Sequence, residues 1–311
     1  MKKILLLILF TGFLNRATAQ QDPQYTHYMY NLSVVNPAYA TATPEVLNLG
    51  GLYRTQWVGA VGAPKTFTFF GHMPASKNVE LGLSFISDDI GDGAKKENNL
   101  FGDFAYVLQL NSNHRLSLGL KAGVTIFETN FNGFVLESGP NGTDPAFAQN
   151  INSVFPNLGA GAFYFTDNYY IGLSAPNLLN TKHLEERQGI NRFGSENVHV
   201  FFTGGYVFQI NQDLKLKPSF MAKVVKGASG VVDVSANVLL YDKFELGASY
   251  RLDDAICGLV NIKVTPDLRI GYAYDYTTTN LGQFNSGTHE VFLLFDLNFM
   301  KKGYDKSPRF F

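Results

Sequence analysis

The stretch "RLSLGLKAGVTIF", Arg115–Phe127, alternates apolar and polar side chains along its whole length. Its apolar members are Leu116, Leu118, Leu120, Ala122, Val124 and Ile126. Between them lie Arg115, Ser117, Gly119, Lys121, Gly123 and Thr125. Because successive side chains of a β-strand point to opposite faces, the pattern predicts a strand with one apolar face and one polar, glycine-rich face.

The same alternation recurs along the chain, for example in "LRIGYAYDY" and "LKLKPSFMAKV". Such segments start near Val46, Thr66, Val79, Asn99, Arg115, Asn157, Asn168, Asn197, Leu214, Val231, Lys243, Ala255, Asp267 and Thr288. Strands of soluble proteins are usually about five or six residues long, whereas these reach about ten or more, the length that crosses a bilayer at a tilt. We therefore predict an all-β fold: a transmembrane antiparallel β-barrel of about 14 strands over residues 46–299.

The connections between the predicted strands alternate in length. Every second one is tight: "NSNH", "TDN", "NQD", "YDK" and "TPD". Those in between include "NFNGFVLESGPNGTDPAFAQNINSVF" and "NLLNTKHLEERQGINRFGSE". Outer-membrane barrels have short periplasmic turns and longer external loops, so the loop lengths predict the orientation independently of the strand pattern.

The beginning of the chain has the features of a secretory signal peptide. Lys2 and Lys3 precede an apolar run from Ile4 to Leu14, and Ala17-Thr18-Ala19 is a small-x-small cleavage site. We interpret residues 1–19 as this signal peptide and expect the mature protein in the outer membrane, in contact with lipid. The net charge of −1 gives no electrostatic basis for binding nucleic acid, and a single cysteine excludes an internal disulfide framework.

The sequence contains no recognisable catalytic motif. Its six histidines are scattered, and none belongs to an H-E-x-x-H pair. "GLSAP" around Ser174 lacks the second glycine of a nucleophile elbow, and "GAGAF" at Gly159 opens a predicted strand rather than a helix. We therefore predict no catalytic, cofactor-binding or metal-binding residues and no enzyme activity. A barrel enzyme that assembles its site from distant strands is the remaining alternative.

The polar faces of the predicted strands carry charges of both signs. The cations are Arg54, Lys121, Lys215, Lys217, Lys223, Arg251, Lys263 and Arg269, and the anions are Glu80, Asp103, Asp233, Glu245, Asp275 and Asp296. They could line a selective pore, or they could pair with one another and fill the lumen. Neither sign dominates, and a charge removed from water needs a partner, so we favour pairing.

The stretch "DPQYTHYMYNLSVVNPAYAT", Asp22–Thr41, differs from the strands that follow. Asp22 and Pro23 suit the start of a helix, an apolar face follows at helical spacing, and Asn36-Pro37 ends it. We expect a helix of about thirteen residues, roughly 20 Å long, within a plug over residues 20–45 that enters the lumen or lies across its mouth. The alternative is a docking element for a partner. The residues of the plug or docking element are Tyr25, Tyr28, Met29, Leu32, Asn36, Pro37 and Tyr39.

The chain closes with "MKKGYDKSPRFF", residues 300–311, a basic tail that we place in the periplasm. Its cations are Lys301, Lys302, Lys306 and Arg309. A frayed terminus is the ordinary interpretation. The alternative is that these cations and the final phenylalanines hold an acidic or aromatic partner surface, since arginine and aromatic residues often anchor interfaces.

The stretch "QDPQYTHYMYNLSVVNPAYA" resembles the N-terminal signature of the PorP/SprF family of type IX secretion system membrane proteins. The resemblance continues in "YRTQWVGAVGAPKT", "SDDIGDG", "LSLGLKAG", "YIGLSAPNLL" and "RIGYAYDY", so that it covers essentially the whole mature chain. The second motif supplies Arg54, Gln56, Trp57, Gly62 and Pro64. Thr41 and Val61 depart from the family's usual residues and affect local turn geometry only.

The resemblance implies an outer-membrane barrel that serves protein secretion and, in some members, adhesin-driven gliding. It implies two kinds of partner: the periplasmic ring of the secretion and motility machinery, and secreted proteins with a C-terminal sorting domain. A passive channel or a hydrophobic-solute transporter is the alternative, because an N-terminal hatch before a fourteen-stranded barrel is also similar to the long-chain fatty-acid transporter.

Overall fold

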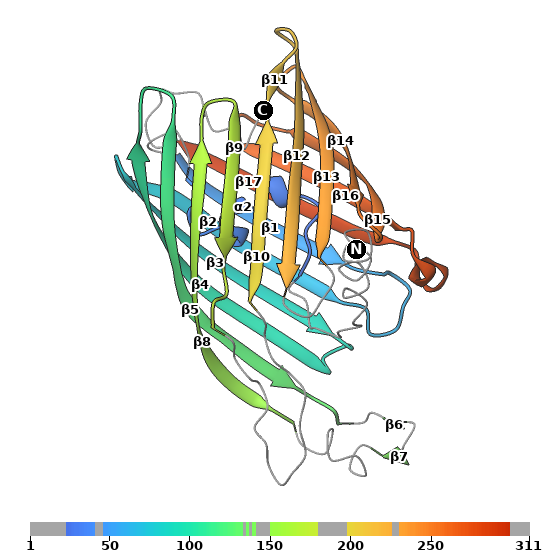
Figure 1. The fold of residues 1–311 in the computed structure, drawn as a ribbon. Helices are drawn as coiled ribbons and strands as arrows, with labels where there is room; N and C mark the ends of the chain where they lie inside the picture. Colours follow the sequence, from blue (N-terminus) through green and yellow to red (C-terminus); the bar gives the residue numbers. More distant parts are fainter. Residues whose placement is uncertain are drawn as a thin grey trace, which may run out of the picture.

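A computed structural model describes residues 23–40, 46–132, 135–136, 139–140, 150–179, 198–225 and 230–298 (Figure 1). Within these ranges fourteen long strands form one antiparallel sheet. They are β1 (Val46–Thr55), β2 (Lys65–Ser76), β3 (Val79–Ile90), β4 (Lys95–Gln109), β5 (Arg115–Thr129), β8 (Asn152–Phe165), β9 (Tyr169–Ala175), β10 (His199–Tyr206), β12 (Leu214–Val225), β13 (Val231–Leu240), β14 (Phe244–Arg251), β15 (Ala255–Lys263), β16 (Leu268–Thr277) and β17 (Thr288–Asn298). Three two-residue strands, β6 (Val135–Leu136), β7 (Gly139–Pro140) and β11 (Phe208–Gln209), complete the set.

The sheet closes on itself. Each long strand pairs with its neighbours in sequence, and β1 pairs with β17 along its whole length, from Val46 opposite Asn298 to Thr55 opposite His289. β10 pairs directly with β12, and the short β11, which follows β10 in the chain, pairs with the next residues of β12. Closure leaves no free sheet edge, the condition for a sheet to lie in a bilayer. The predicted all-β antiparallel barrel of about 14 strands is thus confirmed.

The barrel has an apolar exterior and a polar interior. On β5, Leu118 and Leu120 are 49% and 64% exposed, whereas Ser117 and Lys121 are 0% and 1% exposed. A soluble protein would bury the leucines and expose the lysine. The reversed order is the one expected where the outer surface faces lipid and the polar side chains line the lumen.

The two ends of the barrel differ in their connections. At one end the turns are tight and are closed by their own polar side chains. The Asn111 carboxamide oxygen accepts hydrogen bonds from the N–H groups of Asn113 and His114, both at 3.0 Å, and Asn211 accepts one from Asp213 at 2.9 Å. Asparagine favours turns because its side chain can replace a backbone partner in this way. We call this the short-turn end and assign it to the periplasm.

The connections at the other end are mostly longer, and we call this end the long-loop end and assign it to the external side. They include 56–64 and 278–287, the latter holding the 3₁₀ helix η3 (Asn280–Phe284). Of the connections at this end that the structure describes completely, two are short, 91–94 and 252–254. The difference in loop length between the ends is therefore a tendency in this chain rather than a strict alternation.

The N-terminal segment lies inside the barrel, where Figure 1 shows it in blue among the strands. It holds one 3₁₀ turn, η1 (Tyr28–Tyr30), and one α-helical turn, α2 (Leu32–Val35). The predicted continuous helix of about thirteen residues is therefore wrong. All of residues 25–40 are buried, so the segment has no solvated face, and backbone N–H groups that a helix would use are bonded to the barrel wall. Among the described residues, no helix has the length and apolar character needed to cross a membrane.

Candidate functional site

The lumen wall binds the backbone of the plug through one carboxylate. Glu290, on β17, accepts the N–H of Thr26 on Oε2 at 2.9 Å and the N–H of His27 on Oε1 at 2.7 Å. Nδ1 of His27 lies 2.8 Å from the same Oε1, and its Nε2 lies 3.1 Å from Oδ1 of Asn261. Hydrogen bonds to a buried carboxylate are stronger than those between neutral groups, so Glu290 fixes the start of η1 on the wall.

Arg54 joins the plug to three strands. From β1 its guanidinium donates to Glu290 at 3.0 Å, to Oγ1 of Thr26 at 3.0 Å and to Asp275 on β16 at 2.9 Å. The Thr26 hydroxyl in turn donates to Asp275 at 2.7 Å. Arg54 is 2% exposed, and breaking such a buried pair by removing one partner is strongly destabilising. This network holds the plug near the long-loop end.

Several other lumen charges are paired as well, as the charge pattern predicted. Arg251 binds Asp233 at 3.0 Å, and Lys121 binds Asp103 at 3.0 Å. Near the short-turn end Arg269 binds Glu245 at 2.9 Å. The first two pairs join neighbouring strands, whereas the third joins β14 to β16 across β15. Each pair places a buried charge beside one of opposite sign.

Three tyrosines attach the plug to the wall by their hydroxyls. Tyr25 lies 2.9 Å from Oγ1 of Thr68, and Tyr28 lies 3.0 Å from Oγ of Ser235. The Tyr30 hydroxyl donates to Glu245, near the short-turn end. Burial raises the pKa of Tyr28 to about 12, so this hydroxyl is neutral at physiological pH. Between Thr26 and Tyr30 the segment therefore runs along the lumen from the long-loop end towards the short-turn end.

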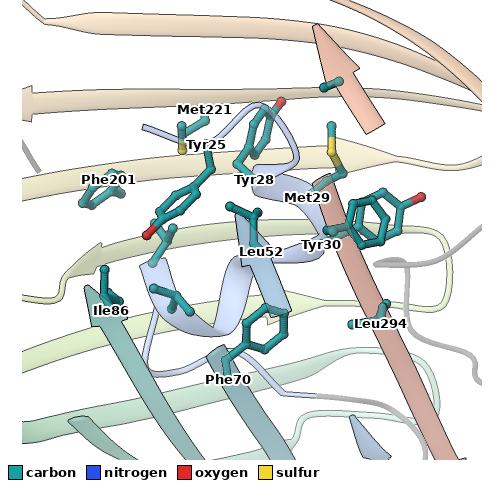
Figure 2. Packing of buried hydrophobic residues seen from close by; sticks show 14 of the residues in the cluster. Tyr25, Tyr28, Met29, Tyr30, Leu52, Phe70, Ile86, Phe201, Met221 and Leu294 are labelled. Carbon is teal, nitrogen blue, oxygen red and sulfur yellow. The ribbon is translucent and has the colours of Figure 1, made fainter. Parts of the chain in front are cut away.

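The same side chains pack against apolar residues of the wall. Figure 2 shows Tyr25, Tyr28, Met29 and Tyr30 among Leu52, Phe70, Ile86, Phe201, Met221 and Leu294. The Tyr30 ring stacks on Phe292, with 5.0 Å between ring centroids. Each fully buried side chain of this size adds about 1.5–3 kcal/mol, so the apolar contacts reinforce the polar ones.

Glycines of three neighbouring strands form a seat for Asn36-Pro37. A Cβ atom added at Gly161 on β8 would lie 2.2 Å from Oδ1 of Asn36, and one at Gly119 on β5 would lie 2.3 Å from the Pro37 carbonyl oxygen. At Gly172 on β9 it would lie 2.9 Å from Nδ2 of Asn36. No other residue type leaves room for so close an approach.

Polar contacts hold the segment on this glycine seat. Asn36 donates to the Ala162 carbonyl at 3.1 Å and accepts the Ala38 N–H at 2.9 Å, and Ser174 donates to the Val35 carbonyl at 2.9 Å. The ring of Tyr39 then lies 5.2 Å from that of His72 on β2. The plug thus contacts strands on opposite sides of the barrel.

The residues of the predicted barrel motif do not form one group. Arg54 belongs to the plug network described above. Gln56, Trp57 and Pro64 line a wide cavity at the long-loop end, together with Pro23 of the plug. Gly62, with φ of +71°, packs on the turn at residue 91, where an added Cβ would lie 3.0 Å from a backbone carbon.

A second cavity lies beside the plug, with a volume of about 70 Å³. Apolar side chains of the plug and of the wall line most of it. It shares Pro23, Gln24 and Val231 with the wide cavity at the long-loop end, so the two adjoin. Within the described ranges, His, Cys, Asp and Glu side chains form no group of three that could hold a metal ion.

Sequence reasoning missed several functional residues. Thr26, His27 and Glu290 carry the plug network, yet none was predicted for it. Glu290 has the same strand parity as Asp296, which the pattern did place in the lumen, so alternation alone could have found it. The predicted tail residues Lys301, Lys302, Lys306 and Arg309 lie outside the described residues.

The family of type IX secretion system membrane protein PorP/SprF matches residues 17–295 of this chain. None of the curated proteins is significantly similar to the chain in sequence.

Solved structures of other proteins resemble the chain at low sequence identity. The toluene transporter TbuX of Ralstonia pickettii is 10% identical, with a TM-score of 0.51 over 86% of this chain and 93% of that chain. The outer membrane protein Omp33 of Acinetobacter baumannii is 9% identical, with a TM-score of 0.48 over 82% of this chain and 100% of that chain. A FadL homologue of Pseudomonas aeruginosa is 12% identical, with a TM-score of 0.45 over 91% of this chain and 96% of that chain. The chain is an outer-membrane barrel, as its strand pattern predicted.

Proposed function

The chain belongs to the PorP/SprF family of type IX secretion system membrane proteins, and from this premise we propose that it supports the export or surface retention of specific secreted proteins. Its role is non-enzymatic. It acts as a membrane component of the secretion machinery, in which the barrel provides a fixed site for partners on both sides of the outer membrane.

One observation carries this proposal beyond family membership: the plug is bonded to the wall on all sides. Glu290 and Arg54 hold its beginning, Tyr30 reaches Glu245, and Asn36 lies on the glycines of β5, β8 and β9. A passive pore needs a continuous water path, and this segment lies across it. The arrangement favours a barrel that binds other proteins over one that conducts solutes.

The proposed partners differ at the two ends. At the short-turn end β17 finishes at Asn298, so the basic tail of residues 300–311 follows on the periplasmic side. There it meets components of the periplasmic ring. At the long-loop end the cavities beside the plug face outward, where secreted proteins with a C-terminal sorting domain are retained.

A second candidate is transport of a hydrophobic solute. The observation that favours it is the apolar cavity between the plug and the wall. A hydrocarbon could enter there from the external side. Uptake, however, also needs a route past the plug network on the periplasmic side, where the segment is bonded to Glu245 through Tyr30.

The proposal is tested in a strain that lacks the chain and is complemented with it. We expect proteins with a C-terminal sorting domain to disappear from the surface or the medium in the deletion strain and to return on complementation. The purified barrel should show little conductance in planar bilayers. Unchanged secretion, together with steady ion conductance or uptake of apolar solutes, would favour the transport function.

A further inference from the structure

The cavity beside the plug is largely apolar and is built jointly by the plug and the wall. Its apolar residues include Tyr25, Val35, Ile86, Phe101, Phe201 and Met221. Figure 2 shows four of these, Tyr25, Ile86, Phe201 and Met221, around the same part of the lumen. A concave apolar site with a few polar groups is the usual form of a ligand-binding pocket.

Four carboxamide residues line this cavity, Gln24, Asn99, Asn157 and Asn177, and two of them, Asn157 and Asn177, hold unpaired polar atoms. Asn157, at the long-loop half of β8, and Asn177, just after β9, both line it and are each 4% exposed. Among the described residues, neither Nδ2 nor Oδ1 of Asn177 has a hydrogen-bond partner, and Oδ1 of Asn157 has none. The Leu178 N–H donates to the Leu158 carbonyl at 2.7 Å, which fixes the chain beside both carboxamides.

Buried polar atoms are almost always paired, so a fixed and unpaired carboxamide in a pocket indicates the chemistry of its ligand. Asn177 offers one donor and one acceptor side by side. Their complement is one acceptor and one donor on the same side, which the N–H and C=O of one residue in an extended chain offer. A hydrocarbon has neither. The charged residues that line the cavity, Glu97, Lys223 and Asp233, carry both signs. Glu97 and Asp233 are already paired with Lys95 and Arg251, so these charges do not select a charged ligand.

The pocket is reached from the external side. Pro23, Gln24 and Val231 line both it and the wide cavity at the long-loop end, where Trp57 also lies. A chain that enters between the external loops can therefore place one side chain beside the plug.

We infer that this cavity binds an extended segment of a secreted polypeptide, with one apolar side chain among Phe101, Phe201 and Met221 and the backbone N–H and C=O of one residue on Asn177. The identity of the polypeptide as secreted cargo rests on the proposed function. The chemical class of the ligand, an apolar side chain next to a peptide amide, is argued from the cavity alone and does not rest on the proposed function.

The test uses the full-length barrel in detergent and three probes: N-acetyl-Gly-Phe-Gly-amide, its analogue with an ester in place of one amide bond, and hexylbenzene. Trp57 is the single tryptophan of the chain and lines the adjoining cavity, so its fluorescence reports binding. We expect saturable binding of the peptide and weaker binding of the ester analogue, which lacks the N–H donor. Asn177→Leu should weaken peptide binding about tenfold and leave hexylbenzene binding unchanged or tighter.

Asn98→Leu is the matched control, since it makes the same chemical change on β4 with the parity of the outward-facing Leu100. Equal binding of the peptide and the ester analogue to the wild-type barrel would overturn the inference without any variant. Binding of hexylbenzene alone would overturn it as well and would identify a small-solute site. None of these measurements depends on export, so a failure of this inference and a failure of the secretion proposal are distinct results.

Discussion

The backbone N–H of His27 donates a hydrogen bond of 2.7 Å to Oε1 of Glu290, and this contact joins the N-terminal plug to the last strand of the barrel. Glu290 is completely buried and also accepts the Thr26 N–H and the Arg54 guanidinium. The first and last strands are neighbours in the closed sheet, so one carboxylate links the beginning of the described chain to both of them.

Glu290→Ala tests this link. The change leaves the Thr26 and His27 N–H groups and one side of Arg54 without their partner, a loss of about 3–5 kcal/mol for a broken buried network. The barrel should still assemble, because its strand ladder does not include the plug. We expect the plug to become mobile and conductance in planar bilayers to rise. Glu128→Ala is the control, on β5 and away from the plug, and equal conductance of both variants would contradict the role of Glu290.

Gly161→Ala tests the seat of Asn36. The added methyl group would lie 2.2 Å from Oδ1 of Asn36, so the plug must shift, at a cost of about 1–3 kcal/mol for overpacking. We expect faster proteolysis of the N-terminal segment with normal heat-modifiable migration of the barrel. Gly51→Ala is the matched control, because no atom lies within 4 Å of its added Cβ. Equal proteolysis rates would show that the glycine seat does not hold the plug.

The strand pattern could be predicted because it depends on local alternation. The predicted start of β5 at Arg115 and that of β12 at Leu214 agree with the structure. An outward Leu120 beside an inward Lys121 follows from the pleat alone, without knowledge of any partner strand.

The plug conformation could not be predicted in the same way. Helical spacing of Tyr25, Tyr28, Met29 and Leu32 predicts a helix only where one face is buried and the backbone bonds to itself. Here the segment is enclosed on every side, and Glu290 takes the N–H groups of Thr26 and His27. The unpaired carboxamide of Asn177 could not be predicted from the sequence either, since it depends on which strands meet across the lumen.

Tyr28 predicts a pH dependence of stability. Burial raises the pKa of Tyr28 from 10.0 to about 12. Because the pKa in the folded state is the higher one, the stabilisation is fully present below pH 10 and is lost as the pH rises through about 12, by about 3 kcal/mol. Denaturation in urea at a series of pH values checks this. Tyr28→Phe should lack this part of the alkaline loss, and identical pH profiles would contradict the assignment to Tyr28.

The basic tail predicts a periplasmic contact. Deleting residues 303–311 removes none of the described strands, so the barrel should fold and reach the outer membrane. If the tail docks on the ring, cross-linking of the barrel to ring components should fall. Replacing Lys301, Lys302, Lys306 and Arg309 with glutamine separates charge from length. Undiminished cross-linking of both variants, with normal export, would show that the tail is only a chain end.

The most direct test of the secretion role is quantitative affinity purification of the intact barrel from native outer membranes. We expect enrichment of at least one secreted protein with a C-terminal sorting domain, together with components of the periplasmic ring, over a purification of an unrelated outer-membrane barrel. Recovery of the barrel with lipid alone, at the same depth of detection, would contradict the secretion role.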